Sequence, residues 1–136
     1  MTSNKTVFFI IGSLLIVLGI FMLVPYGIQV FYKENSHSFL SSSFVTILIG
    51  VLFVLANLEK EYQLNLKQTF LFSTFAWVSI AMFGSLPFIL SDINFSLSDA
   101  FFESMSGITT TGSTVVENLD TSPKSILLWR AIMQWL

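Results

Sequence analysis

Uncharged, oxygen-bearing residues gather at one place in the chain, the run Ile108–Thr114 (ITTTGST). Extended backbone in such a run can point its carbonyl oxygens at a cation and replace the cation's hydration shell, a chemistry that suits potassium. Threonine hydroxyls can add ligands or tie the loop to its surroundings, and Gly112 permits a backbone dihedral that a side chain would forbid. The run therefore predicts a cation-coordinating loop. Its candidate ligands are Thr109, Thr110, Thr111, Gly112 and Ser113.

Two other interpretations of this run remain open. Consecutive threonine, serine and glycine residues are also typical of a surface loop. Gly107 and Gly112 have the spacing of a phosphate-binding loop, but Ser113 stands where such a loop has lysine. No strand-like run precedes these residues either, which further disfavours a phosphate site.

The residues before the run predict a short helix. Ser96 and Asp99 have the spacing of a capping box, with Ser96 as the N-cap and Asp99 at the third helical position. Gly107 offers a left-handed end to a helix of about 15 Å, half of the roughly 30 Å hydrocarbon core. Non-helical backbone is tolerated at that depth only where protein or a watery pore surrounds it. The pattern therefore predicts a pore helix followed by a pore loop.

The composition is that of an all-α membrane protein. Of 136 residues, 54% are hydrophobic and only 10% are charged, against about 25% in soluble domains. A net charge of −2 disfavours a nucleic-acid partner, and without cysteine no disulfide or thiolate metal site is expected. The single histidine, His37, is expected in a solvated connector. Because no nucleophile–base pair or metal cluster is visible, we expect no enzyme activity.

Three apolar runs are long enough to cross a lipid bilayer as helices. They are Val7–Val24, Phe39–Leu58 and Thr69–Leu90. The first run could instead be a signal peptide, but it is longer than a signal-peptide core and does not end in small residues. We therefore favour a retained helix.

Prolines and glycines predict where these helices bend or end. Pro25 and Gly27 are expected to kink or end the first helix. Pro87 is expected in the last turn of the third, where a bend could direct the chain toward the pore helix. After the loop, Ser122-Pro123 predicts a helix start, but Lys124–Leu136 would rise only about 18 Å. Such a helix would end inside the membrane, so we expect a fragment whose last helix is truncated.

The charged residues favour a cytoplasmic N-terminus. Three of the five lysines would then lie inside, a weak agreement with the positive-inside rule. The inner set is Lys5, Lys60 and Lys67, and the outer set is Lys33 and Lys124. Four acidic residues would lie outside around the loop, where they could concentrate cations, unless the outer loops merely lack lysine. They are Asp92, Asp99, Glu117 and Asp120.

Two charged residues, Glu103 and Arg130, lie in otherwise apolar helix. A charge at membrane depth is costly unless it is paired, so each is a functional candidate. We expect the two to pair, so that the helix after the loop braces the pore helix. The alternative is that both side chains reach the outer interface separately.

Three segments closely resemble the Trk-type potassium uptake pore subunits, the TrkH family of the Trk/Ktr/HKT superfamily of cation transporters. The segments are Gly84–Phe88 (GSLPF), Ser98–Thr114 (SDAFFESMSGITTTGST), and Leu127–Arg130 with Gln134-Trp135. The likeness covers the whole chain in layout and the part from Gly84 onward in detail.

The resemblance implies an N-terminal transmembrane helix pair followed by helix–pore loop–helix repeats around one pore. Residues 1–66 would be the helix pair and 67–136 the incomplete first repeat. Backbone oxygens of the candidate loop would form part of a potassium filter, with Thr110 and Thr111 as the strongest candidates and K⁺ as the transported ion, without another cofactor. The resemblance also implies a homodimer of the full-length subunit, a cytoplasmic nucleotide-binding regulatory subunit, and a multi-pass location in the bacterial inner membrane.

A second class of function stays open at this point. The chain could be a small non-conducting membrane interaction protein, or a truncated remnant of the transporter, whose threonine loop performs no ion chemistry. Three further threonine and glycine loops downstream of Leu136 would favour transport, and a stop codon there would favour the alternative.

Overall fold

The computed structural model of the chain describes residues 4–34, 37–58, 60–61, 63–91, 95–112 and 124–135. Within them the regular structure is entirely α-helical, as the sequence predicted. The helices are α1 (Lys5–Phe31), α2 (Ser38–Ala56), α3 (Leu66–Gly84), α4 (Leu86–Leu90), α5 (Leu97–Ile108) and α6 (Lys124–Trp135).

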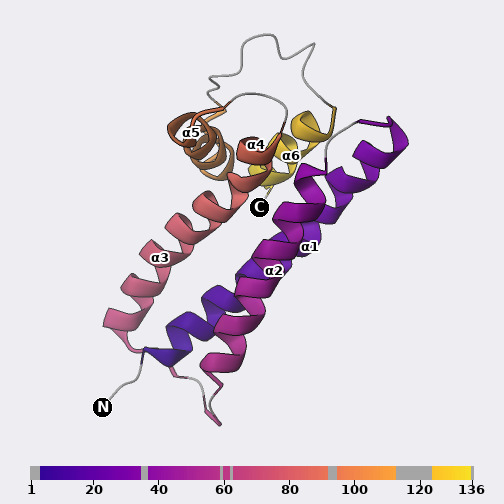
Figure 1. The fold of residues 1–136 in the computed structure, drawn as a ribbon. Coiled ribbons are helices and arrows are strands. Elements are labelled where there is room, and N and C mark those ends of the chain that lie inside the picture. Colours follow the sequence, from indigo (N-terminus) through magenta and orange to yellow (C-terminus); the bar gives the residue numbers. More distant parts are fainter. Residues whose placement is uncertain are drawn as a thin grey trace.

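Three segments are long and apolar enough to cross a membrane: α1, α2, and α3 together with α4. Figure 1 shows α1 and α2 as an antiparallel hairpin with α3 beside it. α4, α5 and α6 gather at the end of the hairpin where α1 joins α2, and the N-terminus lies at the opposite end (Figure 1). The short helices therefore share one end of the bundle with the α1–α2 connector.

Small residues bring α1 and α2 into backbone contact. A Cβ atom added to Gly12 would lie 2.7 Å from the carbonyl oxygen of Gly50, and one added to Gly50 would lie 2.7 Å from that of Gly12. Further along the hairpin, Ser43 Oγ donates a hydrogen bond of 2.7 Å to the carbonyl oxygen of Gly19. Small residues are how membrane helices pack closely when apolar contact alone gives little advantage over lipid.

Pro25 and Gly27 were expected to kink or end the first helix, and an end there is wrong, because α1 continues through both residues to Phe31. A kink stays a prediction. The helix ends in a Schellman motif with Lys33 in the left-handed conformation, at a φ of 52°. The Glu34 N–H donates to the Gln29 carbonyl oxygen at 2.9 Å, and the Lys33 N–H donates to that of Val30 at 3.3 Å.

The third span begins earlier than expected and is interrupted near its end. α3 starts at Leu66, behind a full capping box of Asn65 and Gln68. It ends at Gly84, and Pro87 belongs to the first turn of α4 rather than to the last turn of α3. Proline suits the first turn of a helix, where its missing N–H has no intrahelical partner.

The buried core follows α1 from Val7 to Met22 and continues among the short helices. Its largest fully buried side chains include Met22, Phe39, Phe88, Trp129 and Met133. These side chains come from α1, α2, α4 and α6, so the core crosses the predicted division at residue 66, and that division stays a prediction.

Candidate functional site

The predicted pore helix is α5, and Ser96 is its N-cap, as expected. Ser96 Oγ accepts a hydrogen bond of 3.2 Å from the Asp99 backbone N–H. The 12 residues of α5 rise about 18 Å, which is close to the expected half-membrane length. One face of the helix is buried. It carries Ala100, Glu103, Ser104, Ser106, Gly107 and Ile108.

The end of α5 differs from the prediction, because Gly107 is helical and not left-handed. The left-handed residue is Thr110, with a φ of 58°. The Thr111 N–H donates to the Ser106 carbonyl oxygen at 3.0 Å and the Thr110 N–H donates to that of Gly107 at 3.0 Å. This is again a Schellman motif, with threonine where glycine is usual.

Hydroxyl groups hold the turn that follows α5. Thr109 Oγ1 donates to the Met105 carbonyl oxygen at 2.7 Å and lies 2.9 Å from Thr111 Oγ1. Thr110 Oγ1 donates to the Thr109 carbonyl oxygen at 2.7 Å. Gly112 has a φ of +76°, a backbone conformation that favours glycine, as the sequence predicted. Of the candidate ligands, Ser113 lies outside the described residues.

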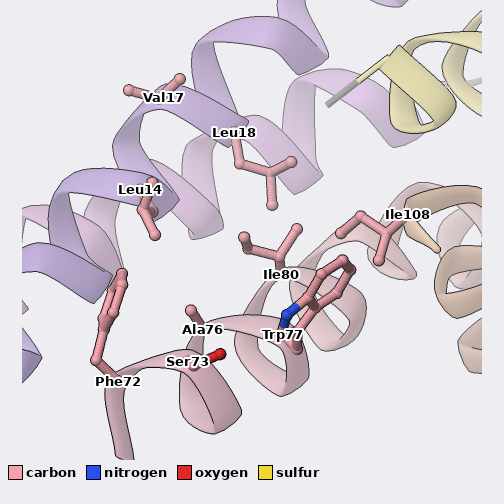
Figure 2. A pocket seen from close by; sticks show the side chains of 9 residues that line it. All are labelled: Leu14, Val17, Leu18, Phe72, Ser73, Ala76, Trp77, Ile80 and Ile108. Atoms are coloured by element: carbon pink, nitrogen blue, oxygen red, sulfur yellow. The ribbon is translucent and has the colours of Figure 1, made fainter. Parts of the chain in front are cut away.

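The depth of this turn follows from the neighbours of Ile108, the last residue of α5. Ile108 lines an apolar pocket together with Leu14 and Leu18 of α1 and Trp77 and Ile80 of α3 (Figure 2). These neighbours lie near the middle of the membrane-length segments and not at their ends. α5 therefore enters from one end of the bundle and stops near half the depth of the spans.

The pocket itself does not have the chemistry of a cation site. Its volume is about 300 Å³, and its lining is almost entirely carbon. Ser73 and Trp77 supply the only polar side-chain groups among the lining residues that Figure 2 labels. The oxygen-rich group is the turn beyond Ile108.

Thr109, Thr110, Thr111 and Gly112 are themselves exposed. No described residue donates a hydrogen bond to the carbonyl oxygens of Thr110 and Thr111. Within the described part of the chain, the turn is therefore joined to the bundle through the buried end of α5, and its other side is exposed.

Glycine at two positions allows α5, α6 and α3 to approach closely. A Cβ atom on Gly107 would lie 3.1 Å from Met133 Cβ, so this glycine serves packing and not the helix end. A Cβ atom on Gly84 would lie 2.7 Å from Met133 Cε and 2.8 Å from Ser104 Oγ. Sequence reasoning noted both glycines but missed this role, because close approach leaves no local signal in the sequence.

Buried hydrogen bonds join the same three helices. Ser104 Oγ donates to the Ala81 carbonyl oxygen at 2.6 Å, and Trp129 Nε1 donates to the Gly84 carbonyl oxygen at 3.0 Å. The carbonyls at the end of α3 are thus satisfied by side chains of α5 and α6, which matters where water is absent.

The two charged candidates lie together. Arg130 Nε of α6 donates to Glu103 Oε2 of α5 at 3.0 Å. The Glu103 side chain is 1% exposed and that of Arg130 is 15% exposed. Glu103 therefore does not reach the interface separately.

Of the remaining acidic candidates, Asp99 alone lies among the described residues. Asp99 is exposed, and Asp92, Glu117 and Asp120 lie outside the described residues. Among the residues that the structure describes, no group of three or more histidine, cysteine or acidic side chains could hold a metal ion. The candidate site is therefore a neutral oxygen-lined turn braced by one buried ion pair.

Comparison with known proteins gives a consistent family. The TrkH family, described as cation transport protein, matches residues 35–136. An uncharacterized cation transporter of Methanocaldococcus jannaschii is 41% identical over 93% of this chain and 27% of its own length. The Trk system potassium uptake protein TrkH of Escherichia coli is 35% identical over 93% of this chain and 26% of its own length.

A solved structure agrees with these relatives. The crystal structure of the potassium transporter TrkH from Vibrio parahaemolyticus matches with a TM-score of 0.92 and 34% identity. The match covers 98% of this chain and 29% of that protein, so the chain spans less than a third of the relatives it matches. Because the family match covers well over half of the sequence, the chain belongs to the TrkH family of cation transport proteins.

Proposed function

We propose that this chain supplies the N-terminal helix pair and one pore-loop repeat of a Trk-type potassium uptake system. One observation carries the proposal: α5 stops near mid-span beside Leu18 and Ile80, and the oxygen-rich turn follows directly. Polar backbone at that depth is stable only beside protein or a water-filled path. A cation path along the turn accounts for both its chemistry and its depth.

The coordinating groups in this proposal are neutral backbone oxygens. The loop residues Thr109, Thr110, Thr111 and Gly112 carry no charge, and among the described residues none donates a hydrogen bond to the carbonyls of Thr110 and Thr111. Neutral dipoles can replace the hydration shell of a monovalent cation without holding the ion too tightly to release it. Ser113 completes the proposed set by position in the sequence.

In this proposal Glu103 and Arg130 stabilise the loop by fixing α5, the helix that precedes it. Their ion pair joins α5 to α6 one turn before the end of α5. Removing one partner would leave the other charge buried, so the pair resists displacement of α5 relative to α6.

The wider assembly is proposed from the relatives. Two are named Trk system potassium uptake protein TrkH, and all three cited relatives are more than three times as long as the matched region. We infer that further repeats close the open side of the turn and that K⁺ is the ion. The proposal includes a homodimer, a cytoplasmic nucleotide-binding regulator and the bacterial inner membrane, with the N-terminus inside.

A non-conducting membrane interaction protein is the second candidate, and the exposure of Thr109–Gly112 is the observation in its favour. On that reading the turn contacts a partner or solvent and its backbone conformation has no effect on ions.

The experiment is potassium uptake by an uptake-deficient bacterial strain that carries the intact gene, with and without Gly112→Ala. Because alanine at a φ of +76° is strained by about 1–2 kcal/mol, we expect potassium-over-sodium preference to fall by about tenfold. Gly27→Ala is the matched control, since a Cβ atom there meets nothing within 4 Å. Undiminished potassium preference in the Gly112 variant, at equal protein levels, would contradict the filter assignment.

A further inference from the structure

The connector between α1 and α2 contacts the start of α6, although the two are far apart in sequence. Glu34 Oε2 accepts a hydrogen bond of 2.5 Å from Ser125 Oγ, and Glu34 Oε1 lies 3.5 Å from the Ser125 backbone nitrogen. Ser125 is completely buried and Glu34 is half-buried. One carboxylate from the hairpin therefore accepts hydrogen bonds from both donors of a single residue of α6, its backbone N–H and its hydroxyl group.

Ser125 is the second residue of α6, where the backbone N–H has no acceptor within the helix. The Glu34 carboxylate provides that acceptor from a segment 91 residues away. Two further contacts from the hairpin reach α6. Lys124 Nζ lies 4.4 Å from the centre of the Tyr32 ring, and the Phe39 and Trp129 rings meet edge to face at 6.0 Å.

The direction of Glu34 is fixed by the end of α1. The left-handed Lys33 turns the chain sharply, and the Glu34 N–H is bonded to the Gln29 carbonyl oxygen at 2.9 Å. The carboxylate is thus held on a closed turn rather than on a free loop.

The position of α6 affects the position of the loop, because α6 contacts the C-terminal half of α5, which precedes the loop. Arg130 binds Glu103, and Met133 packs against Gly107. Any shift of α6 along its axis would have to break the Glu103–Arg130 bond or move the end of α5 with it. The described contacts thus run from Glu34 through α6 and α5 to the turn at Thr109.

We propose that Glu34 is a positioning residue for the cation-coordinating loop, with the α1–α2 hairpin fixing α6 and, through it, the end of α5. This inference rests on the proposed function. The TrkH family match begins at residue 35, so Glu34 and α1 lie outside the part of the chain that the match describes. The hairpin is then part of the machinery that sets ion preference and not only a membrane anchor.

The test compares Glu34→Ala, Ser125→Ala, the double variant and Glu34→Gln in the intact transporter. Ion preference is read as potassium over sodium uptake per amount of protein in the membrane. We expect Glu34→Ala to lower the preference about fivefold, the factor produced by one lost hydrogen bond. The double variant should be no worse than Glu34→Ala. Glu34→Gln should keep most of the preference, because its amide can accept from the Ser125 N–H and donate to Ser125 Oγ.

The matched control is Glu61→Ala, an exposed carboxylate in the α2–α3 connector at the other end of the bundle, which should leave the preference unchanged. If Glu34→Ala does not accumulate, Glu34→Asp is the second variant and should give an intermediate preference, because its shorter side chain keeps the charge but reaches less far.

Unchanged ion preference in Glu34→Ala or Glu34→Asp, with or without reduced protein levels, would overturn the positioning role and leave a purely structural one. Additive losses from Glu34→Ala and Ser125→Ala would also overturn it. Failure of the proposed function is separate, since it would show as normal preference in Gly112→Ala.

Discussion

Thr110 is a β-branched residue in the left-handed region, a conformation that such residues rarely adopt. Two backbone hydrogen bonds of the Schellman motif and the bond from Thr110 Oγ1 to the Thr109 carbonyl hold it there. Strain of this kind persists where the surrounding structure determines the conformation, and it gathers at functional sites. The strained backbone of Thr110 therefore agrees with the proposal that the turn it begins is a functional site.

We expect Thr110→Gly to be more stable than Thr110→Val by about 1 kcal/mol. Both variants lose the hydroxyl bond, but only glycine relieves the left-handed strain, partly offset by the greater entropy of its unfolded chain. Thermal unfolding of the purified protein in detergent measures the difference. A valine variant as stable as the glycine variant would show that Thr110 is not strained.

The local signals in the sequence were reliable where one residue decides the outcome. Ser96 predicted the start of α5, and Gly112 predicted a positive φ, because each follows from the chemistry of its own side chain. The ends of α1 and α5 were not predictable in the same way. Lys33 and Thr110 occupy the left-handed positions, where glycine is usual, and the local hydrogen bonds of each Schellman motif hold them there.

At the scale of elements, α5 is held by two unlike kinds of contact. Small residues allow close approach at Gly84 and Gly107. A buried ion pair and buried hydrogen bonds fix the position of α5 along its neighbours. Apolar packing alone would permit sliding of one helix past another, since neighbouring positions on a helix are similar. The polar contacts select one register.

We expect Glu103→Gln and Arg130→Gln each to destabilise the protein by about 3–5 kcal/mol, because each leaves the partner charge buried without its counter-charge. The double variant should cost clearly less than the sum of the two. A double-mutant cycle on thermal stability measures the coupling. Independent, additive effects would show that the 3.0 Å contact does not stabilise the fold.

Hydrophobic length predicted the membrane-length segments, since the three apolar runs in the sequence correspond to α1, α2, and α3 together with α4. The pairing of Glu103 with Arg130 was expected because both were isolated charges in apolar helix. The interruption at Ser85 and the capping box at Asn65 were not expected. Apolar pattern places a helix but does not fix its last turn, which depends on what the turn packs against.

At the scale of the whole molecule, the two ends of the bundle differ. One end carries the α1–α2 connector and the short helices, and the other carries the N-terminus (Figure 1). The chain has no cysteine, so single cysteines can report which side of a membrane each end occupies.

We expect Asn4→Cys and Glu61→Cys to react with a membrane-impermeant thiol reagent only after the cells are opened, and Lys33→Cys to react in intact cells. This follows from the proposed cytoplasmic N-terminus and from three crossings by α1, α2 and α3 with α4. Labelling of Glu61→Cys and Lys33→Cys from the same side would contradict the crossing of α2.

α5 has no basic residue in its last turn, so no side chain of the helix itself compensates the negative end of its macrodipole, which faces the turn. With about half an elementary charge at about 5 Å and an effective dielectric constant of about 20, this end attracts a monovalent cation by about 1–2 kcal/mol. Chloride would be repelled to the same degree. If the turn lines a cation path as proposed, the half-length helix would discriminate ions by sign with no acidic side chain, before the loop discriminates among cations.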